Sequence, residues 1–335
     1  MTAQITTFGA TADGRPVRAV HLRAGALRAT ILTHGARLQD LRLAGVPWPL
    51  TLGAKSVAAY EGPMAYFGAV VGPVANRIAG AAAVIDARRH DFAANEPGPT
   101  TLHSGPTGTH AQIWQIKAAT AHSLTLGLDL QDGLGGFPGN RHLQAHYALT
   151  SPADLRLVLR ATSDAPSLMN LANHSYWNLD GAADTTRHQL GLAAEHYLPV
   201  NARLIPATPA PVARTGFDFR KPREMDAAFP LDHCFCLPGD RLLPCHAARL
   251  KGARGVQLDL ATNAPGLQVY DGRGLATAPH AGLAGSPYGP RAGLALEPQH
   301  WPDAAGRDDF PSISLRPGQI YEQISVFSFT QGQMA

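Results

Sequence analysis

The stretch LTLGLDL, residues 124–130, places leucine at every second position, with a polar residue or glycine between the leucines. Successive side chains of a β-strand point to opposite faces of the sheet. This alternation therefore predicts a strand with one face in the core and the other in solvent or in a cleft. The same two-residue period recurs in Leu155–Arg160 and Val256–Thr262, and Ile324–Phe329 is predicted to be a final strand.

A helical period is nearly absent from the rest of the chain. The only candidate is a short turn of helix near Ala54–Tyr60, whereas Arg18–Leu22 and Arg28–Leu32 are predicted to form a hairpin around Ala24-Gly25. The 335 residues include 34 glycines and 27 prolines, without a collagen-like period, which indicates many short elements joined by turns. We predict an all-β protein, a large antiparallel β-sandwich or barrel, in which residues 1–335 form a single domain.

The charge pattern argues against nucleic acid as a partner. The formal net charge is +3, and the lysines and arginines are scattered along the chain. The nearest thing to a basic run, Arg88-Arg89-His90, is followed at once by Asp91 and is predicted to be a solvated loop. The N-terminal segment has no signal-peptide core, and no run of 18 apolar residues occurs, so we expect no membrane partner and a cytoplasmic location.

The three cysteines, Cys234, Cys236 and Cys245, give no disulfide framework, and their spacing is not that of a zinc site. We interpret them as small buried strand residues.

Glu297 follows the apolar segment Gly293–Leu296 and precedes Pro298. By alternation it shares a face with Ala295, opposite the core face, at a predicted strand exit. Partial burial would raise the pKa of this carboxyl and suit it to act as a base near neutral pH. A solvated carboxylate at a strand end is an equally good interpretation of the pattern.

His174 lies among amides and aromatic residues in NLANHSYWNLDG, residues 170–181. Histidine exchanges a proton readily near pH 7, and aromatic faces beside hydrogen-bonding groups suit a sugar. The alternative is a buried histidine that is satisfied by the backbone.

Three further polar segments are candidates for a site. His103 is predicted to start a loop, and Asp232-His233 precedes the strand-like Cys234–Leu237. Asn76-Arg77 lies in an otherwise apolar run, where an unpaired guanidinium is unfavourable. Arg77 is therefore predicted either to bind a ligand through hydrogen bonds or to form a structural pair with a carboxylate.

Other chemistries fit the sequence poorly. His142 and His146 would share a strand face without a third ligand nearby, so we expect no metal site. The glycine-rich run Gly133–Gly139 has Pro138 at the third glycine position and no helix after it, which favours a hairpin or active-site loop over a nucleotide loop.

The polar segments resemble those of the galactose mutarotase (aldose 1-epimerase) family, from about residue 5 to 329. NLANHSYWNLDG is similar to the family's N-L-T-N-H-S-Y-F-N-L-x-G, and VANRIAG (74–80) is similar to V-A-N-R-I-x-x-G. Further matches follow in the same order, namely TLHSG (101–105), the pieces DG and GFPG of 132–139, GFDFRKP (216–222), LDHCFCL (231–237), ALEPQHWPDA (295–304) and LRPGQIYEQISVFSF (315–329).

The resemblance implies a β-sandwich of the mutarotase type with an open sugar cleft and no cofactor. It implies that Glu297 takes the proton of the anomeric hydroxyl and that His174 protonates the ring oxygen, with His103 close by. It further implies that sugar hydroxyls are held by Asn76, Arg77, Asp232 and Gln268. We therefore expect the protein to bind a monosaccharide and to be a monomer or a homodimer.

The sequence departs from the family pattern at the rim of the expected cleft. Ser104 stands where the family has a glycine, and Asp271-Gly272-Arg273-Gly274 stands where the family has T-G-N-F. Residues 108–114 differ from the family's G-F-D-K-x-x-W segment, and residues 132–136 differ from its acidic D-G-E-E-G loop. A neutral aldose is expected, with weakened discrimination between epimers because an aromatic is missing at Gly274. There are two alternatives. One is a sister enzyme that acts on a hexose 6-phosphate, with Arg273 as the anion site, and the other is a non-catalytic sugar-binding sandwich. A glycosidase fits less well because it needs two carboxylates.

Overall fold

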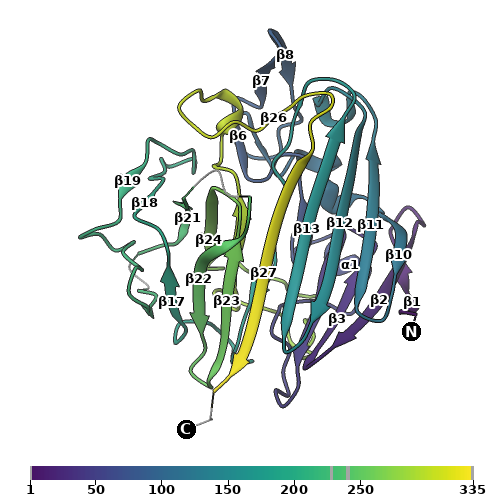
Figure 1. Cartoon of the computed structure of the whole chain (residues 1–335), viewed down its shortest axis with the longest axis vertical. Coiled ribbons are helices and arrows are strands. Elements are labelled where there is room, and N and C mark those ends of the chain that lie inside the picture. Colours follow the sequence, from purple (N-terminus) through teal and green to yellow (C-terminus); the bar gives the residue numbers. More distant parts are fainter. Residues whose placement is uncertain (1, 227–228, 239–241, 333–335) are drawn as a thin grey trace.

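The computed structural model describes residues 2–226, 229–238 and 242–332, and they form a structure built mainly of antiparallel strands (Figure 1). Its long central strands lie side by side and belong to a nine-stranded sheet. In spatial order, the strands of this sheet are β10 (Gln115–Ala119), β11 (Ser123–Leu130), β12 (Arg141–Thr150), β13 (Asp154–Ser163), β27 (Tyr321–Gln331), β23 (Val256–Thr262), β22 (Cys245–Lys251), β17 (Gln189–Leu192) and β20 (Arg223–Glu224).

Two smaller sheets complete the framework. The six-stranded sheet has the order β16 (Tyr176–Trp177), β25 (Leu294–Gln299), β24 (Gly266–Tyr270), β21 (Asp232–Cys236), β18 (His196–Tyr197) and β19 (Ala210–Pro211). The four-stranded N-terminal sheet has the order β1 (Gln4–Ala10), β2 (Pro16–Ala24), β3 (Leu27–Leu32) and β4 (Arg37–Leu43).

The remaining elements are short. The strand pairs are β5 (Val70–Val71) with β15 (Ala172–Asn173), β6 (Arg77–Ala79) with β9 (Thr100–Leu102), β7 (Ala82–Ile85) with β8 (Arg88–Asp91), and β14 (Ser167–Leu168) with β26 (Ser314–Leu315). Helical structure in the described residues is limited to the single turn α1 (Val57–Tyr60) and the 3₁₀ turns Gly105–Thr107, Thr109–Ala111, Leu134–Gly136 and Ala304–Gly306. The predicted scarcity of helix is confirmed.

The core forms where one face of each of the three sheets meets the others. The leucines of β11 are buried, as their alternation predicts, and they join one continuous cluster with Val20 of β2, Leu258 of β23 and Leu296 of β25. The layers are held together mainly by the burial of apolar surface, which contributes roughly 25 cal/mol of stabilising free energy per Å² removed from water.

The six-stranded sheet has a core face and a polar face. Leu294 and Leu296 of β25 point into the core, whereas Ala295 and Glu297 lie on the opposite face. Glu297 is in register with Gln268, and Ala295 is in register with Tyr270. The predicted assignment of faces is therefore confirmed, and it places polar side chains from neighbouring strands next to one another.

Several predicted boundaries are wrong. Glu297 does not end its strand, since β25 continues to Gln299. Pro298 is accommodated because β16 pairs only with Leu294 and Ala295, which leaves that side of β25 without a partner strand at the proline. Asp232 and His233 lie inside β21 rather than before it.

Two surface expectations also need correction. Arg88-Arg89-His90 is exposed or half-buried but belongs to β8, in a small hairpin with β7, and is not a loop. Of the three free cysteines, Cys234 is buried, while Cys236 and Cys245 are only partly buried.

No helix in the described part of the chain combines the length and the apolar character needed to cross a membrane. The organisation of residues 1–335 as one domain stays a prediction.

Candidate active site

All seven residues predicted for the site line one pocket of about 310 Å³. The complete lining is Tyr66, Asn76, Arg77, Leu102, His103, His174, Tyr176, Leu204, Asp232, Gln268, Tyr270 and Glu297. The pocket is of the size that suits a small ligand, and it combines aromatic side chains with convergent polar groups.

The six-stranded sheet forms one wall of this pocket. Glu297 of β25, Gln268 of β24 and Asp232 of β21 share the face turned away from the core. The side-chain amide of Gln268 donates a hydrogen bond to Asp232 Oδ1 at 2.6 Å. This bond fixes the amide orientation, so that the carbonyl oxygen of Gln268 is left as an acceptor.

His174 is held by its backbone in the short link between β15 and β16. Its amide donates to the carbonyl of Ala69, and its carbonyl accepts from the amide of Gly68, both at 2.8 Å. The ring Nδ1 is buried and has no hydrogen-bond partner among the described residues. The alternative of a histidine satisfied by the backbone therefore does not describe the ring.

The opposite wall comes from two tight turns. Asn76, His103 and Ser104 all have positive φ angles, of 61°, 50° and 64°. Residues other than glycine are uncommon in this region, and such conformations cluster at functional sites. The backbone amide of Asn76 donates to Nδ1 of His103 at 3.1 Å, and the amide of His103 donates to the carbonyl of Asn76 at 2.9 Å.

The bond from Asn76 fixes the tautomer of His103. Because Nδ1 accepts this bond, the proton of the neutral ring resides on Nε2. Burial, followed by the nearby His174 and His110 and by Arg77, holds the pKa of His103 well below its usual value, so the ring is neutral. His103 therefore presents an N–H donor.

Glu297 and His174 form a buried pair, with Oε1 of the carboxyl 3.6 Å from Nε2 of the ring. Burial, reinforced by Asp232, raises the pKa of Glu297 well above its usual value, and Arg77 opposes this shift. Burial lowers the pKa of His174 to about 4. Each shift favours the uncharged form of its group, and at this separation a proton can pass between Glu297 and His174 without changing the net charge of the pair.

A metal ion fits this cluster poorly. Ligand atoms of His103, His174 and Glu297 lie within 4.8 Å of one another, which is the one such group found among the described residues. A metal bound to Nε2 of His103 would force its proton onto Nδ1, where it would face the N–H of Asn76. The predicted strand pair His142 and His146 contributes no ligand to this group.

Arg77 enters the pocket as half of a bidentate ion pair. Its Nε and Nη2 donate to the two oxygens of Glu96 at 2.8 and 2.9 Å. The structure therefore shows the carboxylate pair that was one of the two alternatives for Arg77, and at the same time places the side chain in the pocket lining. The fork geometry fixes the guanidinium plane.

Replacing Glu96 with glutamine is expected to raise KM for the sugar by about tenfold, while kcat changes little, because the oriented donor Arg77 is lost but the reacting groups remain. Steady-state kinetics checks this. Glu322→Gln, which removes the partner of the exposed Arg160, is the matched control and should leave both constants unchanged. An unchanged KM in Glu96→Gln would contradict this role for the pair.

Sequence reasoning missed Tyr66, Leu204 and Glu96. The ring of Tyr66 lies 4.6 Å from that of His103 and 6.0 Å from that of His174, between centres. The loop that carries Tyr66 is held by Arg37, which is fully buried and donates to the carbonyls of Met64, Ala65 and Phe67. No periodic pattern marks this loop, so no signal pointed to Tyr66.

A profile of the aldose 1-epimerase family matches residues 18–328 of the chain. The human galactose mutarotase is 34% identical over 329 residues, which are 95% of each chain. The aldose 1-epimerase of Escherichia coli K12 is 34% identical over 336 residues, 95% of this chain and 96% of that protein.

The chain belongs to the aldose 1-epimerase family.

Solved structures of the family share the fold. An aldose epimerase homologue from C. elegans is 28% identical, with a TM-score of 0.87, covering 93% of this chain and 98% of that one. The galactose 1-epimerase of Lactobacillus acidophilus is 26% identical, with a TM-score of 0.84 and coverage of 99% for each chain. The predicted family and the predicted fold, a large antiparallel sandwich of the mutarotase type, are confirmed.

The family departures at the rim have a structural explanation at two positions. Arg273 donates to both oxygens of Asp271, at 2.8 to 3.1 Å, and does not line the pocket. Arg291 also approaches this carboxylate, with its Nε 3.8 Å from Oδ2. At Gly274, a Cβ atom would lie 2.8 Å from the hydroxyl of Tyr270, which accepts a hydrogen bond from the Gly274 amide. Tyr270 therefore supplies the aromatic ring of the pocket in this region.

Proposed function

We propose that this protein is an aldose 1-epimerase that interconverts the α and β anomers of a free aldose. The observation that carries the proposal is the Glu297–His174 pair, 3.6 Å apart in a pocket lined by sugar-binding groups. The names of the relatives, galactose mutarotase and aldose 1-epimerase, support the same reaction.

In the proposed reaction the shared proton moves to His174 when the anomeric hydroxyl donates to Glu297. Glu297 then takes the hydroxyl proton while His174 protonates the ring oxygen, and the carbon–oxygen bond of the ring breaks. The resulting aldehyde rotates about its bond to the next carbon, and closure with the roles reversed gives the other anomer. Each proton transfer by a positioned group contributes about 100- to 10,000-fold.

The other lining residues hold the sugar in register for these transfers. Nε2–H of His103 is a donor directed at a sugar oxygen, and Asn76, Arg77, Asp232 and Gln268 bind ring hydroxyls. Tyr66, Tyr176 and Tyr270 provide apolar ring faces. The reaction includes no redox or radical step, so we propose that it requires no cofactor and no metal.

We propose that the substrate is a neutral aldose, with galactose and glucose among those accepted. Arg273 is bound to Asp271 and lies outside the pocket lining, which argues against its use as a phosphate site for the sugar. A cytoplasmic location, consistent with three free cysteines, and a monomer or homodimer belong to the same proposal.

Polarimetry on fresh pure anomers is expected to show accelerated mutarotation of galactose and glucose, with efficiencies within about 10- to 200-fold of each other, and a lower efficiency for glucose 6-phosphate. A chelator should leave the rates unchanged. Absence of any acceleration would favour a sugar-binding protein without catalysis. Highest efficiency on the phosphorylated sugar would favour the sister activity, and Arg273→Gln would then be the variant to test.

A further inference from the structure

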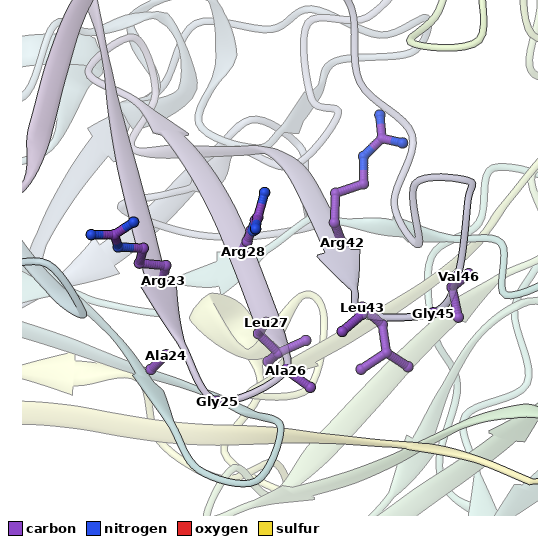
Figure 2. A pocket seen from close by; sticks show the side chains of 11 residues that line it. Arg23, Ala24, Gly25, Ala26, Leu27, Arg28, Arg42, Leu43, Gly45 and Val46 are labelled. Carbon is purple, nitrogen blue, oxygen red and sulfur yellow. The ribbon is translucent and has the colours of Figure 1, made fainter.

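Three arginines lie side by side across the four-stranded sheet, and none of them lines the catalytic pocket. Arg23 of β2 is in register with Arg28 of β3, which is in register with Arg42 of β4. The residues next to them along the strands are leucines and alanines that are buried in the core or packed against it, so the arginines project from the opposite, outer face of the sheet. Figure 2 shows the three side chains rising from adjacent strands above the β2–β3 turn.

Two hollows meet at this arginine row. One, of about 590 Å³, is lined by the row together with the β2–β3 turn and the chain that follows β4 as far as Val46 (Figure 2). The other, of about 460 Å³, shares all three arginines and is also lined by polar side chains, namely those of Gln4, His21, Thr30 and Asp40. Both volumes lie in the range of small-molecule sites.

The arginine row carries excess positive charge. Arg42 donates to both oxygens of Asp40, at 2.8 and 2.9 Å. Arg23 and Arg28 form no ion pair with any residue in the described ranges. Like charges directly opposite one another destabilise a sheet, so the stability of the fold does not account for this arrangement.

The spacing of the row determines the ligand chemistry. A guanidinium fork binds a phosphate through two parallel hydrogen bonds. Adjacent strands are about 4.8 Å apart, so the backbone positions of the row span about 10 Å, and a chain of linked phosphates matches donors spread over this length better than a single phosphate does. The described residues that line the two hollows include no Phe, Tyr or Trp, so neither hollow offers a surface on which a base could stack.

We propose that Arg23, Arg28 and Arg42 form a binding site for a small polyphosphate, which is recognised through linked phosphate groups and not through a base. None of the three residues lines the catalytic pocket, so this site is separate from the proposed epimerase reaction and does not depend on it.

Isothermal titration of the full chain with inorganic pyrophosphate and with orthophosphate, at low ionic strength, tests the site. We expect pyrophosphate to bind more tightly than orthophosphate, and Arg28→Gln to weaken pyrophosphate binding about tenfold or more. Arg18→Gln removes the same charge from an exposed position of β2 outside the row, opposite Thr7, and should leave the affinity unchanged.

Two further measurements separate a binding role from a structural one. The Tm of Arg28→Gln should equal or exceed that of the parent, because a like-charge contact is relieved, and its mutarotation rate should be unchanged. Equal affinity for the two phosphates, or equal weakening in Arg28→Gln and Arg18→Gln, would overturn the proposal. So would binding of a single-stranded oligonucleotide in the absence of pyrophosphate binding.

Discussion

Replacing Glu297 with glutamine, or His174 with asparagine, is expected to lower kcat for anomer interconversion by about 100- to 10,000-fold. Each change removes one of the two groups between which a proton must pass, and both groups are buried within 3.6 Å of each other, so water cannot readily replace either. Polarimetry or coupled assays on pure anomers measure the effect.

The two groups act as one unit, so the double variant should be about as slow as the slower single variant, and not slower by the product of the two effects. Glu297→Gln should keep or raise the stability of the fold, because the carboxyl is buried and its Oε2 has no hydrogen-bond partner. Glu224→Gln, an exposed change on β20, is the control. Near-native turnover in either single variant would show that the roles are assigned wrongly.

The second large expected effect is a loss of stability of the fold at acidic pH. The protein is expected to lose several kcal/mol of stability between about pH 6.5 and pH 5, because interior histidines must be neutral in the fold. Burial lowers their pKa values to about 3 for His34 and His110, to about 4 for His174, His233 and His300, and well below the usual value for His103.

The sign follows from where the protons bind. The unfolded chain takes up a proton on each of these six histidines near pH 6.5, whereas the folded chain does so only at a much lower pH, so each of the six removes up to about 1.4 kcal/mol of stability per pH unit in this interval. The raised pKa values of four buried or half-buried carboxyls partly offset the loss, since these groups take up protons at a higher pH in the folded chain than in the unfolded one, namely Asp40, Asp232, Glu297 and Asp303.

Urea unfolding at about pH 7, 6 and 5 measures this dependence of the free energy of unfolding on pH. His34→Gln should reduce the slope by close to one proton, because this buried ring takes up no proton in the folded chain over this interval. A free energy of unfolding that stays constant over this interval would contradict the assignment of neutral interior histidines.

The alternation of side chains carried most of what could be predicted about the fold. It placed the leucines of 124–130 in the core and Glu297 on the opposite face from Leu296, because a two-residue period is a direct consequence of strand geometry. It did not locate strand ends. Pro298 predicts a strand exit, yet β25 continues through it, because whether a proline is tolerated depends on the neighbouring strand and not on the local sequence.

Six of the candidate residues lie in polar segments, Gln268 was added by the resemblance to the family, and the structure brings all seven of them to one pocket. Their partners were not found. Glu96 lies 19 positions from Arg77, and Tyr66 lies in a loop that is held by Arg37 of β4. Such pairings arise from tertiary packing, so no periodicity or local composition could reveal them.

The register of the six-stranded sheet also limits how this protein can vary in length. Glu297 lies opposite Gln268, and Tyr270 lies opposite Asp232. Deleting or inserting one residue in β24 before Gln268 would turn its side chain into the core and direct an apolar neighbour into the pocket, so that a single indel would remove a whole row of hydroxyl-binding groups at once. The strands of the site can therefore accept exchanged side chains but not a changed number of residues, and length variation is left to the connecting loops.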